Sequence, residues 1–270
     1  EQSIAMRALK QAVTLNPDLV PERMLLTRLL IKDNLDEAAQ QITVLSDNIG
    51  ETAQVAELRG LLAMEQGEYA EARAHYLDAF ERQANNQNLM RLVSAETELG
   101  LYAEAASRLR KWLKEYPDDA ATWFELANRE LQRGEETRAL EAFKRVQTLN
   151  PDNPLVLNNL AWLGRRENPT EALAHARKAV KLAPDSADFQ DTLAMVALAA
   201  DSPREALSAI RRALDSRPDD VTFQYHNAVI LAENGDKAKA LLQLEKLLQG
   251  GKAFPDRDKA IQLRDGLSKQ

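Results

Sequence analysis

The chain has 270 residues, a formal net charge of −7, 29% charged residues and 44% hydrophobic residues, a composition ordinary for a soluble protein. The negative charge argues against nucleic acid as a partner, because proteins that track phosphates carry a basic stripe. Cysteine is absent, which excludes disulfide bonds and thiolate sites, and no apolar run approaches the roughly 20 residues of a membrane span.

The stretch 134–163 holds a local pattern that the rest of the chain repeats. From Ala139 onward, apolar residues fall at i, i+4 and i+7, which predicts an amphipathic helix. Pro151 ends this helix. Asp152 or Asn153 can cap a second helix, with Pro154 near its first position, where a missing N–H costs little. The pattern therefore predicts a helix, a stop and another helix.

Aligning the sequence on Ala139 gives a period of 33 or 34 residues, which is typical of a solenoid. The aligned small residues are Ala5, Ala38, Ala72, Ala105, Ala139, Ala172, Ala206 and Ala240. Prolines followed by Asp stand twelve places after five of them, at Pro17, Pro117, Pro151, Pro184 and Pro218. Glycines predicted to turn the chain stand five places before four of them, at Gly67, Gly100, Gly134 and Gly235.

Taken in chain order, the pattern predicts a lone second helix, seven pairs of first and second helices, and a last helix. The predicted helices are Gln2–Leu15; Leu19–Lys32 with Leu35–Ser46; Ala53–Gln66 with Tyr69–Gln83; Gln87–Leu99 with Tyr102–Glu115; Ala120–Arg133 with Glu136–Leu149; Leu155–Arg166 with Pro169–Leu182; Ala187–Ala200 with Pro203–Ser216; Val221–Asn234 with Lys237–Leu248; and Asp256–Leu267. Asn85–Asn88 is the least regular connection.

The period, the small residue followed at +4 by an apolar one, and the proline at +12 resemble the tetratricopeptide repeat, as do Trp123, Leu126 and Ala127. The resemblance implies an all-α, right-handed superhelix. We expect a single solenoid domain over 1–270, with a half repeat at 1–17, seven repeats at 18–252 and a capping helix at 253–270. Departures from the family pattern are Gly50, Ala84 and Lys252 in the proline place, and one residue fewer between the helices of the first and fifth full repeats. Because the first half repeat lacks its first helix, we also expect a fragment of a longer protein.

The sequence predicts no catalytic site, no metal site and no cofactor. It has no Gly-rich phosphate loop, H-E-x-x-H or G-x-S-x-G motif. His75, His175 and His226 are expected to be exposed or packed at helix edges. The acidic pairs Asp118–Asp119 and Asp219–Asp220 are interpreted as helix caps, and the doublets Arg165–Arg166 and Arg211–Arg212 as solvated faces. We therefore expect a protein that is not an enzyme.

The family resemblance implies that a partner binds the concave face formed by the first helices. Carrying over the family's contact positions predicts a groove of aromatic, amide and apolar side chains: Phe124, Asn128, Asn158, Trp162, Asp191, Met195 and Tyr225. The lysine of the family's clamp for C-terminal carboxylates is missing, so chaperone tails are not the expected ligand. The groove suits a protein or peptide, and its aromatic rings and amides could also take polysaccharide. The alternative is that Phe124 and Trp162 only complete packing between helices.

A finer resemblance rests on Asn158–Trp162, Asp191–Leu193 and Phe254–Pro255. These stretches resemble the C-terminal part of bacterial tetratricopeptide proteins linked to exopolysaccharide export, including the lipoprotein type associated with the PEP-CTERM sorting system. The resemblance implies a periplasmic scaffold that docks secretion or polymer-modifying proteins, with a cytoplasmic location left open. A direct glycan-binding solenoid and the substrate-recruiting arm of a larger enzyme remain as alternatives.

Overall fold

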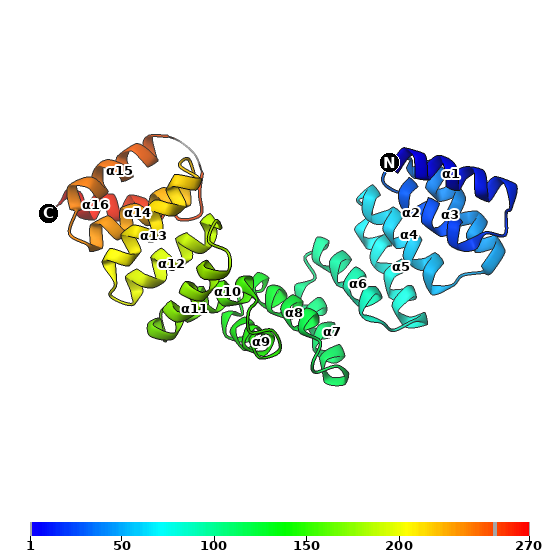
Figure 1. The fold of residues 1–270 in the computed structure, drawn as a ribbon, viewed down its shortest axis with the longest axis horizontal. Helices are drawn as coiled ribbons and strands as arrows, with labels where there is room; N and C mark the ends of the chain where they lie inside the picture. The colour runs from blue at the N-terminus through cyan, green and yellow to red at the C-terminus, as the bar shows by residue number, and fades with distance from the viewer. Residues whose placement is uncertain (1, 251–252, 270) are drawn as a thin grey trace. The chain divides into compact units, whose positions relative to one another are not determined.

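The computed structural model describes residues 2–250 and 253–269, and within these ranges all regular structure is helical. Figure 1 shows the helices in chain order. Their bounds are α1 Gln2–Leu15, α2 Val20–Leu30, α3 Leu35–Ile49, α4 Ala53–Gln66, α5 Tyr69–Arg82, α6 Asn86–Glu98, α7 Tyr102–Glu115, α8 Ala120–Gln132, α9 Glu136–Leu149, α10 Pro154–Gly164, α11 Pro169–Leu182, α12 Ala187–Ala199, α13 Pro203–Ser216, α14 Val221–Glu233, α15 Lys237–Gln249 and α16 Arg257–Ser268. The prediction of an all-α fold is confirmed. Lys252, one of the three residues that replace the stop proline, lies outside the described residues.

The chain divides into two compact units, Glu1–Gly134 with α1–α8 and Glu135–Gln270 with α9–α16. Within each unit, consecutive helices pack against each other, and first helices alternate with second helices. In the second unit, α12 also packs against α10 and α14, so that the first helices of consecutive repeats form a continuous layer. That layer carries the candidate site described below.

Polar side chains cap most first helices, as the sequence predicts. Asp119 accepts a hydrogen bond from the backbone N–H of Thr122, and Asp220 accepts from Thr222 and Phe223. Asn153 caps α10 by accepting from two backbone N–H groups, directly before Pro154. Each cap pairs a donor that the first helical turn would otherwise leave unpaired.

The turn between the two helices of a repeat uses a left-handed residue. Gly67, Gly100, Gly134 and Gly235 have φ of 77°, 71°, 76° and 88°, which confirms the predicted turns. In the sixth full repeat Asp201 takes the same place with φ 53°, a conformation that costs an L-residue about 1–2 kcal/mol. The first and fifth full repeats show no positive φ there: α2 and α10 end early, at Leu30 and Gly164, and residues 31–34 and 165–168 connect them to α3 and α11. The expectation of a shorter connection in these two repeats is therefore wrong.

The recurring alanines mark where helices touch. Seven of them are buried: Ala38, Ala72, Ala105, Ala139, Ala172, Ala206 and Ala240. Ala5, on α1, is exposed, and no helix precedes α1 within the described residues. A small residue at this place lets the two helices of a repeat approach closely.

The first unit also buries three glutamates that the sequence pattern does not predict. Glu57 on α4 pairs with Arg28 at 2.9 Å and Arg91 at 2.6 Å, which links α2, α4 and α6. Glu96 on α6 lies between Arg73 and Arg108, and Glu130 on α8 between Arg110 and Arg133. Because a buried charge without a partner is costly, these pairs fix which helix faces meet.

Candidate functional site

An open pocket of about 550 Å³ lies on the first helices of the second unit. Its walls come from α10, α12 and α14, and from the starts of α13 and α16. The residues that line it are Trp162, Arg165, Arg166, Met195, Leu198, Ala199, Asp201, Pro203, Tyr225, His226, Val229, Glu233, Asp256 and Lys259. Three of the groove residues predicted from sequence, Trp162, Met195 and Tyr225, therefore share one pocket.

Trp162 and Arg165 form one wall together. The Arg165 guanidinium carbon lies 3.8 Å from the centre of the Trp162 ring, and an Nη1–H of Arg165 donates to the backbone oxygen of Trp162. Burial, and then the charge of Arg166, lowers the pKa of Arg165. The expectation that both arginines are solvated is therefore wrong for Arg165, which is half-buried on the indole, and holds for Arg166, which is exposed.

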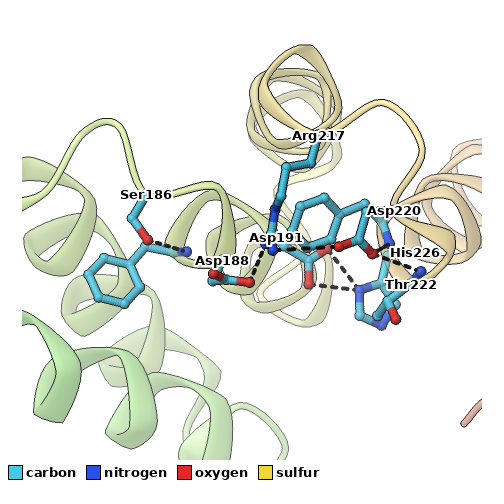
Figure 2. Close-up of polar contacts among 9 residues, drawn as sticks. Ser186, Asp188, Asp191, Arg217, Asp220, Thr222 and His226 are labelled. Atoms are coloured by element: carbon cyan, nitrogen blue, oxygen red, sulfur yellow. Dashed lines mark hydrogen bonds and ion pairs between the residues drawn. The ribbon is translucent and has the colours of Figure 1, made fainter. Parts of the chain in front are cut away.

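The floor of the pocket includes His226, which pairs with the buried carboxylate of Asp191. His226 Nδ1 lies 2.8 Å and 2.9 Å from the two carboxylate oxygens of Asp191, and the two side chains come from α14 and α12 (Figure 2). His226 and Asp191 are 5% and 7% exposed. The expectation that the histidines are exposed or packed at helix edges is wrong for His226. Its ring is buried in the layer of first helices, where it pairs with Asp191, 35 positions earlier in the chain. His75 and His175 are half-buried at helix edges.

Aromatic rings surround this pair. The His226 ring centre lies 6.2 Å from that of Trp162 and 5.8 Å from that of Tyr225, and Tyr225 packs at 6.0 Å against Phe254. Burial, and then the nearby Asp256 carboxylate, raises the pKa of Tyr225. Lys259 at the start of α16 pairs with Asp256 at 2.6 Å. The rings of Trp162, His226 and Tyr225 thus line the pocket, and its rim carries charges of both signs.

Comparison with known families decides what kind of protein this is. Residues 24–88, 90–154 and 192–258, which make up most of the chain, match the model of the tetratricopeptide repeat. The chain belongs to the tetratricopeptide repeat family. No curated protein matches the sequence of this tetratricopeptide repeat protein.

Solved structures share its fold at low sequence identity. A chain of the APC/C hetero-tetramer Cut9–Hcn1 is 15% identical with a TM-score of 0.62; the match covers 97% of this chain and 52% of that one, so the present chain spans about half its length. The C-terminal part of a repeat protein from Cytophaga hutchinsonii is 16% identical with a TM-score of 0.66 over 83% and 94% of the two chains. A tetratricopeptide repeat protein from Parabacteroides merdae is 17% identical with a TM-score of 0.62 over 93% and 99%.

The other predicted groove residues of this tetratricopeptide protein lie in different settings. Asp191 directs its carboxylate at His226, so it positions a pocket residue. Asn158 on α10 is half-buried, and its Oδ1 is buried without a hydrogen-bond partner among the described residues. Phe124 and Asn128 lie half-buried on α8, in the first unit. The second unit therefore holds five of the seven predicted residues, and three of these five line the pocket.

Sequence reasoning missed Arg165, His226 and Lys259. A helical spacing of three between Trp162 and Arg165 was a usable signal, because residues at i and i+3 share a helix face. No such signal links His226 to Asp191, or Lys259 to the pocket, since those contacts join different repeats.

The described residues hold no group of three or more His, Cys, Asp or Glu side chains that could bind a metal ion. Among the same residues, no helix has the length and apolar character to cross a membrane.

Proposed function

We propose that this tetratricopeptide repeat protein is a non-catalytic scaffold whose α10–α16 pocket binds a peptide or helix of a protein partner. The supporting observation is that one pocket gathers Trp162, Arg165 and Tyr225. Trp, Arg and Tyr are the residues enriched at the energetic centres of protein interfaces. A layer of parallel first helices also suits an elongated ligand that crosses several repeats.

The proposal includes a place in bacterial envelope export of exopolysaccharide or protein, in the periplasm. Its support is the resemblance carried by Asn158–Trp162, Asp191–Leu193 and Phe254–Pro255. Trp162 and Asp191 lie at or beside the pocket, so the resembling residues and the proposed binding residues overlap. Fractionation of cells that carry the full-length protein, followed by immunodetection, tests this location; recovery in the cytoplasm would contradict it.

A random dodecapeptide library displayed on phage tests the binding function. Peptides selected on the wild-type protein are re-tested on the variant Trp162→Leu. Leucine is chosen because α4 has Leu61 at the place equivalent to Trp162. We expect pocket-binding peptides to lose about tenfold or more in affinity, the scale of one hot-spot residue, measured by fluorescence anisotropy. The function is contradicted if no selected peptide depends on Trp162, Tyr225 or Arg165.

Direct glycan binding is the second candidate, and the pairing of Trp162 with Tyr225 in one pocket favours it. The variant Trp112→Phe/Trp123→Phe leaves Trp162 as the single tryptophan, since the chain has three. Its fluorescence is then titrated with neutral and anionic oligosaccharides. A saturable change supports glycan binding, and a flat response with every oligosaccharide removes it.

A further inference from the structure

The second helix α7 carries an aromatic side chain where the other second helices bury a smaller one. Trp112 stands seven places after the aligned Ala105. The residues at the same place in the other six full repeats are buried: Leu45, Ala79, Val146, Ala179, Ala213 and Leu247. Ala12, at this place on α1, is half-buried. Trp112 is half-buried. The repeat therefore does not require a tryptophan here.

Trp112 belongs to an aromatic cluster at the surface of the first unit. Its ring stacks on Tyr116 with centres 4.2 Å apart and an interplanar angle of 29°, and Phe80 of α5 lies at 6.3 Å. Tyr116 is 47% exposed. Elsewhere the place of Tyr116 holds mostly polar or small residues, such as Asn150 after α9. An exposed stack of this kind marks an interaction surface when it is not needed for packing.

The indole is held in a fixed orientation. Trp112 Nε1–H donates to Asp119 Oδ2 at 3.0 Å. Asp119 also caps α8, and Asn86 donates to the same oxygen at 2.7 Å. Although burial opposes it, these hydrogen bonds together lower the pKa of Asp119, so the carboxylate stays charged near neutral pH. A rigid aromatic side chain loses little entropy when a partner binds it.

Beside the stack lies a hollow of about 200 Å³, lined by Phe80, Ala84, Arg108, Lys111, Trp112, Glu115 and Tyr116. Ala84 stands where five other repeats have their stop proline. An engineered cavity of about 150 Å³ in another protein holds a benzene molecule, so this hollow has room for one large apolar side chain.

The charges around the hollow favour an acidic partner. Arg108 is already paired with the buried Glu96 at 2.9 Å. Lys111 is exposed, and no ion pair of its ammonium is found within the described residues. Lys114 is exposed on the last turn of the same helix, and Glu115 is the acid among the lining residues. At the end of α7, Lys111 and Lys114 are the exposed basic groups beside Glu115, whereas the nearby Asp119 carboxylate already accepts hydrogen bonds from Trp112, Asn86 and Thr122.

We propose that Phe80, Trp112, Tyr116 and Lys111 form a second docking site, the α7 patch, for a protein segment that inserts one large apolar side chain flanked by acidic residues. The site is separate from the α10–α16 pocket and lies in the other compact unit. With two sites the protein brings two partners together, or holds one partner at two points. The two-point case raises the effective concentration of the second contact.

The same dodecapeptide library tests the α7 patch, with the double variant Trp112→Leu/Tyr116→Asn for counter-selection. The two new side chains are those that Leu45 and Asn150 provide at the equivalent places, so the variant keeps residues that the repeat tolerates. Its thermal unfolding, followed by circular dichroism, checks the fold. We expect a class of peptides that binds the wild type and loses about tenfold or more in affinity on the variant.

Charge is tested on these peptides directly. Replacing their acidic residues by lysine, or introducing Lys111→Glu in the protein, is expected to weaken binding about tenfold, while Trp162→Leu leaves it unchanged. The proposal is overturned if no peptide distinguishes the double variant from the wild type, or if the acid-to-lysine exchange has no effect. Loss of all peptides on Trp162→Leu alone would instead support the pocket and remove the α7 patch.

Discussion

Gly60 on α4 shows how a single residue sets the distance between two helices. A Cβ atom added there would lie 2.4 Å from Tyr76 Cε1 of α5, closer than such atoms approach in proteins. Tyr76 is 2% exposed, so its ring is enclosed by the core and has little room to move away from an added methyl group. At the same two places the sixth full repeat has Ala194 and Ile210, a pair without an aromatic ring.

We therefore predict that Gly60→Ala destabilises the protein. Helix propensity alone would favour alanine by about 1 kcal/mol, but overpacking a filled core costs about 1–3 kcal/mol. The net effect, measured by urea unfolding, should be a loss of about 1–2 kcal/mol.

Gly164→Ala is the matched control for Gly60→Ala, because the nearest atom to its Cβ is Ala172 Cβ at 3.9 Å, an ordinary contact. It should leave stability unchanged or raise it by up to about 1 kcal/mol. Tyr76→Leu introduces the residue that two other repeats have at this place, Leu109 and Leu244. In the Gly60→Ala background it should restore part of the lost stability. Equal stability of Gly60→Ala and the wild type would show that the close approach is not a constraint.

Helix α1 packs mainly against α2 among the described helices and leaves much of its apolar surface exposed. Ala5 is exposed, and Ile4 and Leu15 are 71% and 86% exposed. The α9 helix, by contrast, buries Ala139, Ala142, Phe143 and Val146. Burying a large apolar side chain contributes roughly 1.5–3 kcal/mol, so α1 has far less tertiary stabilisation than α9.

We predict that the backbone amides of Gln2–Leu15 exchange hydrogen with solvent much faster than those of Glu136–Leu149. The reason is that local opening of α1 exposes little apolar surface that is not already in water. Hydrogen exchange followed by mass spectrometry measures both helices in one experiment. Equal protection of the two helices in a monomer would contradict the prediction.

The helices themselves were largely predictable, because each is encoded by its own residues. The bounds expected for α4, α7, α9, α11 and α13 agree with the structure, and α10 begins one residue earlier, at Pro154, since Asn153 caps it. Contacts between repeats were not predictable in the same way. His226 meets Asp191 across 35 positions, and Glu57 meets Arg28 across 29. Such pairs depend on how helix faces are rotated against each other, which the apolar stripe specifies only roughly.

The same limit applies to the candidate site. Trp162, Met195 and Tyr225 were predicted from two family positions that recur in every first helix, and they line one pocket. Arg165 and Lys259 were missed because the walls of the pocket also include the end of α10 and the start of α16, outside the recurring positions. Trp112 was missed because only a comparison of burial at equivalent places shows that it is unusual.

At the scale of the whole molecule, a stack of repeats should transmit a local defect only to its neighbours. Glu96 is fully buried on α6, with Arg108 at 2.9 Å and Arg73 at 3.4 Å. Glu96→Gln removes the carboxylate and leaves two partly buried guanidinium groups without it. Breaking a buried pair in this way costs about 3–5 kcal/mol, and less here because both arginines retain some contact with water.

We predict that Glu96→Gln speeds hydrogen exchange in α5, α6 and α7 and leaves α12, α13 and α14 unchanged. The matched control is Glu104→Gln, which removes the same charge from an exposed position on α7 and should alter neither region. The comparison also tests the expectation that residues 1–270 form a single solenoid domain. Faster exchange to an equal degree in both compact units would contradict this prediction, because it would mean that the chain opens as one cooperative body. An effect confined to one or two repeats would show that stability is a sum of local repeats and of the contacts between them.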